Sequence, residues 1–219
     1  MKIIKILNEE QLKHVRSLTR DMDFRNGEET AHGLAKEAKN NTQAIPQGDG
    51  YKQLLPFIKN ILVKNDWLKR RFMPKIFSLP IINSYKAGDS YGRHYDASHM
   101  IEESRSVRKD YSFTLMLSTL EEYDGGELEI EDNGMKHKVK LDAGDMVIYP
   151  STLIHKVLPV ITGERLAYVG WIASHVKDPL ALEILNAYED MHLSLQQYEL
   201  SSDDRLTLSY VQNKLQHLL

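Results

Sequence analysis

The segment ELEIEDNGMKHKVKLDAGDMVIYPSTLIHKVLPVITGERLAYVGWIA, residues 127–173, decides the expected fold. Short apolar or alternating runs recur in it between turn signals, a pattern that is typical of strands. Asn133-Gly134 separates two of these runs, and this dipeptide is the strongest two-residue signal for a β-hairpin. Ala143-Gly144 marks a further turn. Tight turns between successive strands predict an antiparallel sandwich or jelly roll and argue against a doubly wound fold.

The stretch before this β-rich segment is expected to be mainly helical. Residues 3–7 suggest a short strand, after which Asn8 is a typical N-cap for a helix over about 9–22. Apolar residues at helical spacing predict a second amphipathic helix over about 49–65. These elements would support the β-rich core.

The end of the chain is also expected to be helical. Asp178 suits an N-cap, and Pro179 suits the first helical position, where a missing backbone N–H costs nothing. Ser201 and Asp204 resemble the capping pair of a final helix. That helix has an apolar stripe, which we expect to pack on the sheet or to serve a homodimer. The expected regions are a helical support (1–75), a β-rich core (76–176) and C-terminal helices (177–219).

The composition excludes several classes of function. The 219 residues are 42% hydrophobic and 27% charged with a formal net charge of −3, as in an ordinary globular domain. Lysine and arginine are interspersed with acidic residues, so no nucleic-acid partner is expected. No apolar run is long enough to cross a bilayer, and the first residues lack the apolar core of a signal peptide. We therefore expect a cytoplasmic protein without a membrane partner.

Two separate segments carry side chains that suit a metal ion, and the absence of cysteine rules out thiolate ligands. His94 and Asp96 stand two positions apart, and such residues project from the same face of a strand. His155 lies at the start of a later expected strand. Two imidazoles and one carboxylate on one side of an iron ion form the facial triad of non-haem Fe(II) oxygenases. We therefore predict that His94, Asp96 and His155 are catalytic iron ligands.

Arg165 suits a dicarboxylate co-substrate such as 2-oxoglutarate, because a guanidinium group binds a carboxylate through two parallel hydrogen bonds. Trp171 falls on the same strand face and is expected to be an apolar wall of the co-substrate site. Tyr85 is the first candidate, and Tyr91 the second, for a hydroxyl group that bonds the co-substrate. Either tyrosine could instead be a half-buried strand aromatic. Together these residues predict a hydroxylase that depends on Fe(II) and 2-oxoglutarate.

Other motifs are expected to play no catalytic part. His99, His137 and His175 lack partners at ligand spacing and are expected to be solvated. Gly125-Gly126 is expected to shape the rim near the iron, because paired glycines before a strand mark a sharp turn or a close backbone approach. No phosphate-binding glycine loop is present.

Five segments resemble the bacterial PKHD-type hydroxylases, which are relatives of the prolyl 4-hydroxylases. They are INSY (82–85), YGRHYD (91–96), YDGGELEI (123–130), LDAGDMVIYPSTLIHKVLPVITGER (141–165) and WIASHVKD (171–178). The resemblance runs from KNN at 39–41 to the final helical segment, so it covers nearly the whole chain. It implies an α+β fold in which a double-stranded β-helix, or jelly-roll, core lies between N-terminal and C-terminal packing helices.

The resemblance also implies a function. It places iron on His94, Asp96 and His155 and 2-oxoglutarate on Arg165, and L-ascorbate is the expected reductant. The expected reaction hydroxylates a C–H bond of a prolyl or lysyl type of peptide or amino-acid substrate, with release of succinate and CO2. A small-molecule substrate, such as an iron-chelating metabolite, stays open.

Two departures from the family pattern concern the substrate. His32, in TAHG (30–33), stands where the family has a small residue, and the stretch 97–110 after Asp96 is rich in charge. Loops in such positions commonly cover the substrate. Two alternatives to the hydroxylase also stay open: a jelly-roll sensor that binds metal and 2-oxoglutarate without catalysis, and a cupin-like metal enzyme that does not use 2-oxoglutarate.

Overall fold

The computed structural model describes residues 1–27, 39–102 and 104–218, so His32 lies outside the described residues. The chain forms two compact units, each built from two stretches of sequence. The larger unit comprises Met1–Val63 and Ile76–Ala173, and the smaller comprises Lys64–Lys75 and Ser174–Leu219. The division that the sequence suggested, at residues 75 and 176, stays a prediction.

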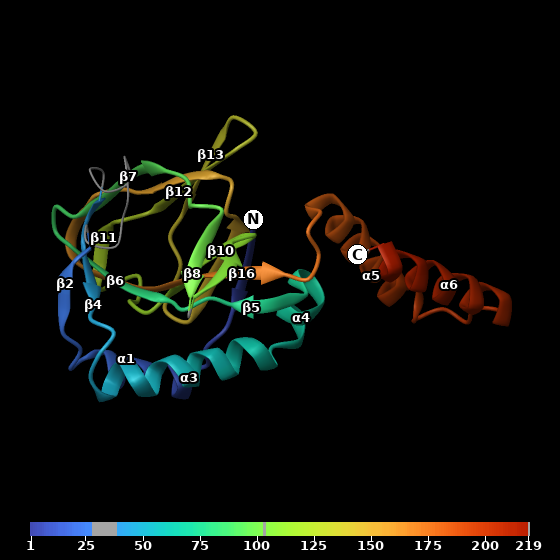
Figure 1. Ribbon diagram of the computed structural model, residues 1–219, viewed down its shortest axis with the longest axis horizontal. Coiled ribbons are helices and arrows are strands. Elements are labelled where there is room, and N and C mark those ends of the chain that lie inside the picture. The colour runs from blue at the N-terminus through green and yellow to red at the C-terminus, as the bar shows by residue number, and fades with distance from the viewer. Residues whose placement is uncertain (28–38, 103, 219) are drawn as a thin grey trace. The chain divides into compact units, whose positions relative to one another are not determined.

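Two antiparallel sheets form the core of the larger unit (Figure 1). The larger sheet has the order β1 (Lys2–Lys5), β14 (Asp145–Pro150), β10 (Tyr111–Met116), β16 (Val160–Ser174), β6 (Ile81–Lys86), β4 (Thr42–Ala44) and β2 (Phe24–Asn26), and β11 (Tyr123–Gly125) also pairs with β16. The second sheet has the order β13 (Met135–Val139), β12 (Leu128–Asp132), β15 (Ile154–Val157), β7 (Ser90–His94) and β3 (Lys39–Asn40). The antiparallel β-rich core expected from the sequence is confirmed.

Apolar side chains from both sheets meet in one buried cluster. Val147 and Ala167 come from the larger sheet, and Leu128, Ile130 and Val157 come from the second sheet. Because residues of both sheets share this cluster, the two sheets pack face to face, as in a jelly roll. The same inter-sheet space holds the polar residues described below.

Helices α1 (Glu9–Thr19) and α3 (Asp49–Lys64) lie side by side in the larger unit (Figure 1). The ring centroids of His14 on α1 and Phe57 on α3 are 4.7 Å apart. Asn8 caps α1 through a capping box with Gln11, in which each side chain bonds the other residue's backbone N–H. Both helices were expected, although α1 ends at Thr19, before the predicted end.

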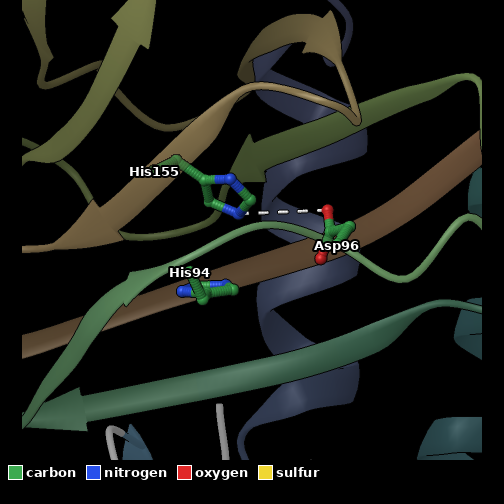
Figure 2. A group of neighbouring side chains, drawn as sticks. All are labelled: His94, Asp96 and His155. Atoms are coloured by element: carbon green, nitrogen blue, oxygen red, sulfur yellow. Dashed lines mark ion pairs between the residues drawn. The ribbon is translucent and has the colours of Figure 1, made fainter. Parts of the chain in front are cut away.

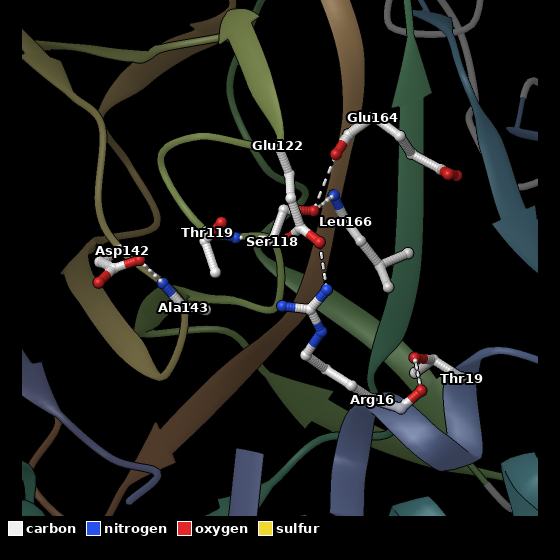
Figure 3. Close-up of polar contacts among 9 residues, drawn as sticks. All are labelled: Arg16, Thr19, Ser118, Thr119, Glu122, Asp142, Ala143, Glu164 and Leu166. Carbon is white, nitrogen blue, oxygen red and sulfur yellow. Dashed lines mark hydrogen bonds and ion pairs between the residues drawn. The ribbon is translucent and has the colours of Figure 1, made fainter. Parts of the chain in front are cut away.

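A polar contact ties α1 to the turn that precedes strand β11 (Figure 3). Arg16 on α1 forms an ion pair with Glu122. In the same turn, the Ser118 hydroxyl donates to the Glu164 carbonyl and accepts the Leu166 backbone N–H, both at 2.8 Å. These two bonds hold the backbone on either side of residue 165.

Two short hairpins connect neighbouring strands, one expected from the sequence and one not. Asn133 and Gly134, with φ of 47° and 79°, join β12 to β13 as the sequence predicted. A second hairpin, β8 (His99–Glu102) with β9 (Arg105–Arg108), was not expected. It occupies the charged stretch that follows Asp96.

The smaller unit is mainly helical. It contains α4 (Asp66–Phe72), α5 (Pro179–Leu195) and α6 (Ser202–Leu218), and β5 (Pro74–Phe77) leads out of it. Asp178 caps α5 by accepting the Leu180 backbone N–H at 2.9 Å, as expected, whereas α4 was not expected. Arg71 forms an ion pair with Asp190 on α5. Among the described residues, no helix is long and apolar enough to cross a membrane.

Gly163 offers a test of how tightly β16 is held. It has a φ of +77°, and a Cβ atom built there would lie 2.0 Å from the Glu122 carbonyl oxygen. We expect Gly163→Ala to lower the free energy of unfolding by about 2 kcal/mol or more, because left-handed strain adds to a backbone clash. Gly134 has a φ of +79° with nothing within 4 Å. Replacing Gly134 by alanine should lower the free energy of unfolding by the left-handed strain alone, about 1 kcal/mol. Urea denaturation measures the free energy of unfolding of both variants. Equal losses of stability would contradict the predicted clash at Gly163.

Candidate active site

His94 and His155 lie opposite each other on two paired strands. β7 ends at His94, β15 contains His155, and the two residues are partners in the antiparallel register. Their ring centroids are 4.3 Å apart. Asp96 lies two residues beyond the end of β7, not within a strand as expected. Its Oδ2 atom is nevertheless only 3.9 Å from Nε2 of His155 (Figure 2).

The ligand atoms of these three residues fit one metal ion. They lie within 4.8 Å of one another, and they form the one such group of three or more found in the described part of the chain. Ligand atoms on one face of an ion, each about 2.1 Å from it, lie about 3 Å apart. Shifts of about 1 Å in each side chain would therefore bring the three ligand atoms onto one ion.

Backbone carbonyls set the orientation of both imidazole rings. Nδ1 of His94 lies 2.7 Å from the Gly92 carbonyl oxygen, and Nδ1 of His155 lies 3.0 Å from the Leu153 carbonyl oxygen. A carbonyl only accepts, so each Nδ1 carries the proton and each Nε2 keeps its lone pair. This hydrogen bond on the far nitrogen is the one that metal-binding histidines ordinarily make.

Asp96 is held by two donors from the larger sheet. The Ser112 hydroxyl and the Trp171 indole N–H donate to the same oxygen, Oδ2, at 2.5 and 2.9 Å. Oδ1 makes neither of these bonds. These two bonds fix the orientation of the carboxylate, and Oδ2 is also the oxygen that lies 3.9 Å from Nε2 of His155.

The protonation of the group also suits a cation. Burial lowers the pKa of His94 to about 4, and the nearby His155 adds to this shift. Burial alone would raise the pKa of Asp96, but His155 and the hydrogen bonds from Ser112 and Trp171 lower it below the ordinary value. At neutral pH His94 is therefore neutral and Asp96 is charged, as metal ligands require.

Aromatic rings surround the two histidines. Tyr91 stacks on His94 with ring centroids 3.7 Å apart, and Tyr149 meets His155 edge-on at 5.2 Å. Tyr91 therefore packs against an expected ligand. Such packing restricts the rotation of both imidazoles.

Arg165 is buried in the same inter-sheet space, with 3% of its surface exposed. It faces Tyr85 across the β16–β6 pair, and its guanidinium carbon lies 5.3 Å from the centre of the Tyr85 ring. Its Nε atom is buried without a hydrogen-bond partner among the described residues. A buried guanidinium with an unused donor suits an anionic ligand, because such a charge is costly to leave unpaired.

A cavity of about 10 Å³, room for about one water molecule, adjoins Arg165. Its walls are mostly aliphatic and include Leu128, Val139 and Val147, with hydroxyl groups from Thr114 and Tyr123. This volume is below the range that drug-sized ligands occupy. The aliphatic walls and the cation beside them suit a short aliphatic chain that ends in a carboxylate, once the side chains move apart to admit it.

One of the paired glycines lies beside Arg165. Gly125 and Gly126 both have positive φ, and a Cβ atom on Gly126 would lie 3.1 Å from Cδ of Arg165. Gly126 therefore shapes the wall next to Arg165, and the expected place of the pair at the rim near the iron stays a prediction.

Tyr149 connects the two halves of the site and was missed in the sequence. It packs on His155, and burial raises its pKa well above the ordinary value. Both the Asp96 carboxylate and the Arg165 guanidinium act on that pKa, in opposite directions. Its hydroxyl therefore lies within electrostatic range of both groups. The run DMVIYP (145–150), which contains Tyr149, has the pattern of an ordinary core strand, so the sequence did not single out Tyr149.

The structure brings together most of the expected residues. His94, Asp96 and His155 converge, and Tyr85 lies against Arg165. Trp171 bonds Asp96, and its expected place as a wall of the co-substrate site stays a prediction. Three other histidines are at least partly exposed and join no group of this kind among the described residues: His99, His137 and His175.

Comparison with known proteins identifies the family. Residues 80–173 match the model of the 2OG-Fe(II) oxygenase superfamily. A PKHD-type hydroxylase of Hyphomonas neptunium is 36% identical over 211 residues, which cover 96% of this chain and 94% of that protein.

Solved structures support the fold. A prolyl-4-hydroxylase of Pseudomonas putida is similar with a TM-score of 0.55 at 22% identity, over 80% of this chain and 92% of that one. HygX of Streptomyces hygroscopicus, solved with nickel, 2-oxoglutarate and hygromycin B bound, is similar with a TM-score of 0.55 at 11% identity, over 79% and 82% of the two chains. The expected jelly-roll core in an α+β fold is confirmed. The chain therefore belongs to the PKHD-type hydroxylases and is an Fe(II)- and 2-oxoglutarate-dependent dioxygenase.

Proposed function

We propose that His94, Asp96 and His155 hold the Fe(II) ion and that Arg165 holds the far carboxylate of 2-oxoglutarate. The observation that carries the proposal is the convergence of the three ligand side chains within 4.8 Å. The buried Nε of Arg165 without a partner supports the second part. Tyr85 and Trp171 are proposed to complete the co-substrate site.

The reaction that fits these residues converts a C–H bond to C–OH. When bound, iron supplies the oxidising chemistry: dioxygen and 2-oxoglutarate are consumed, one oxygen atom enters the substrate, and succinate and CO2 leave. The chain itself orients the ligands through the Gly92 and Leu153 carbonyls and through Ser112. The aliphatic side chains beside Arg165, which include Leu128, Val139 and Val147, would exclude water from the co-substrate chain.

The substrate is proposed to be a prolyl or lysyl type of peptide or amino acid. The family name and the similar prolyl-4-hydroxylase support this class. The antibiotic bound in the similar HygX keeps a small-molecule substrate open. A cytoplasmic location and ascorbate as the reductant stay predictions.

Turnover of 2-oxoglutarate tests the proposal against its alternatives. We expect succinate release with Fe(II), ascorbate and a panel of prolyl and lysyl compounds, and Arg165→Ala should raise the KM for 2-oxoglutarate at least about tenfold, because a charged hydrogen bond is lost. Arg20→Ala, an exposed arginine beyond α1, is the control. Binding of 2-oxoglutarate without turnover across the panel would favour the sensor, and indifference to Arg165→Ala would favour a cupin-like enzyme.

Ser112 is expected to act through Asp96. Ser112→Ala removes one of the two hydrogen bonds on Asp96 Oδ2, so the carboxylate is less well oriented and metal affinity should fall about 10- to 100-fold. Calorimetric titration with Mn(II), which needs no turnover, measures the change. Ser106→Ala, on the exposed part of β9, should leave the affinity unchanged. Equal Mn(II) affinities of the wild type, Ser112→Ala and Ser106→Ala would contradict the role of Ser112.

We further propose that α6 pairs with α6 of a second copy. Leu206 and Tyr210 lie one helical turn apart and are 70% and 61% exposed. Asp203 stands in the first turn and His217 in the last turn. In an antiparallel pair about a two-fold axis, Asp203 of one helix would lie near the end of the other helix that carries Lys214 and His217. This charge complementarity favours a second copy over an unrelated partner.

The pairing predicts a concentration-dependent dimer. Light scattering after size exclusion should give the mass of a dimer, and Leu206→Glu should give a monomer, because the charge would be buried in the interface. Ser209→Glu is the control, because Ser209 is exposed on the same helix but lies beside the face that carries Leu206 and Tyr210. A wild-type monomer at all concentrations would rule out the pairing.

A further inference from the structure

Ser112 belongs to a row of side chains on one face of the larger sheet. In the antiparallel register, Ser112 on β10 is the direct partner of Trp171 on β16 and of Tyr149 on β14. Direct cross-strand partners project from the same face of a sheet. Ser112 and Trp171 both bond Asp96, and Tyr149 meets His155 edge-on. This face of the larger sheet therefore supports the proposed metal ligands.

Ser151 adds one more hydroxyl group to this row. It follows directly after β14 and is 2% exposed. Its Oγ atom lies 2.8 Å from Oγ of Ser112. Its backbone N–H donates to the Asp110 carbonyl at 3.0 Å. Ser151 is therefore held both by its backbone and by its side chain.

The chemistry of these groups sets the direction of the two hydrogen bonds. A hydroxyl group carries a single proton, and an ionised carboxylate can only accept. The Ser112 proton therefore goes to Oδ2 of Asp96, at 2.5 Å. The proton between the two serine oxygens must then come from Ser151. A chain of two hydrogen bonds runs from Ser151 through Ser112 to the carboxylate.

The segment 151–153, between β14 and β15, supports two of the proposed ligands at once. The Leu153 carbonyl at its end accepts the hydrogen bond from Nδ1 of His155, at 3.0 Å. Ser151 at its start is connected to Asp96 by the chain of hydrogen bonds. The same short segment is thus coupled to an imidazole and to the carboxylate.

We propose that Ser151 is a positioning residue for the metal site. By donating to the Ser112 oxygen, Ser151 fixes the rotamer in which the Ser112 hydroxyl donates to Asp96. Hydrogen bonds in a chain polarise one another, so loss of the outer bond weakens the bond that orients the carboxylate. The inference rests on the proposed role of Asp96 as an iron ligand. It extends the support of the site to a residue two hydrogen bonds away from the carboxylate.

Metal binding without turnover tests the inference. The full-length protein, freed of metal with a chelator, is titrated with Mn(II) in a calorimeter. Ser151→Ala removes the outer hydrogen bond, and we expect the Kd for Mn(II) to rise about three- to tenfold, because one neutral hydrogen bond is lost. An unchanged Kd would overturn the proposal. A wild-type protein that does not bind Mn(II) would instead contradict the assignment of the triad, and the inference with it.

Ser84→Ala is the matched control. Ser84 on β6 belongs to the same sheet, is 1% exposed, and also donates to a carboxylate, that of Glu164. Its loss should affect the fold in a similar way but leave the Kd for Mn(II) within about twofold of wild type, a size that reflects no lost support of a ligand. An equal rise for Ser84→Ala and Ser151→Ala would mean that these buried hydroxyl groups act only on the fold. That result would overturn the proposal.

A double-mutant cycle gives the sharper test. In a Ser112→Ala background, Ser151→Ala should no longer change the Kd, because the hydroxyl group through which Ser151 acts is gone. The same rise in both backgrounds would overturn the proposal. If Ser151→Ala fails to fold, Ser151→Thr and Ser151→Val decide, because these two side chains share a shape and differ in the hydroxyl group. Ser151→Val should bind Mn(II) more weakly than Ser151→Thr, and equal Kd values would overturn the proposal.

Discussion

The register between β7 and β15 is the constraint on which the site depends. It places His94 directly opposite His155, so two residues far apart in the chain become cross-strand neighbours. A slip of one residue would turn one of the two side chains to the other face of the sheet. The register is held on the far side of β15 by β12, whose Ile130 lies opposite His155 and is fully buried. The packing of the apolar cluster between the sheets therefore sets the geometry of the proposed metal ligands.

Charge in the inter-sheet space follows from the same packing. Asp96 and Arg165 are both buried there, and Tyr149 lies within electrostatic range of each. An isolated buried charge is costly, so each group needs a partner of the opposite sign. In the proposed site, a metal cation would neutralise the Asp96 carboxylate and the co-substrate carboxylate would neutralise the Arg165 guanidinium. The two ligands together would relieve both costs, so the loaded protein is expected to be the more stable form.

The sequence predicted those parts of the site that rest on residue type and local spacing. The Asn133-Gly134 hairpin and the helix capped by Asn8 are set by neighbouring residues, and both are confirmed. The convergence of the triad was also expected, although Asp96 lies beyond the strand and not within it. The supporting contacts of Ser112 and Tyr149 could not be predicted, because they depend on which strands pair and which faces meet. The presence of a serine or tyrosine in a strand does not indicate which carboxylate or imidazole its side chain will contact.

The N-terminal segment shows why the core motifs alone describe the site incompletely. The superfamily match covers residues 80–173, and every expected ligand lies within it. Yet β3 pairs with β7 and β4 pairs with β6, so residues 39–44 take part in both sheets. Buried amides in this stretch replace the apolar side chains that a strand usually offers, which is why the sequence there gave no strand signal. The amides of Asn41 and Gln43 both donate to Asn83 on β6, so this polar stretch fixes the N-terminal segment to the strand that carries Tyr85.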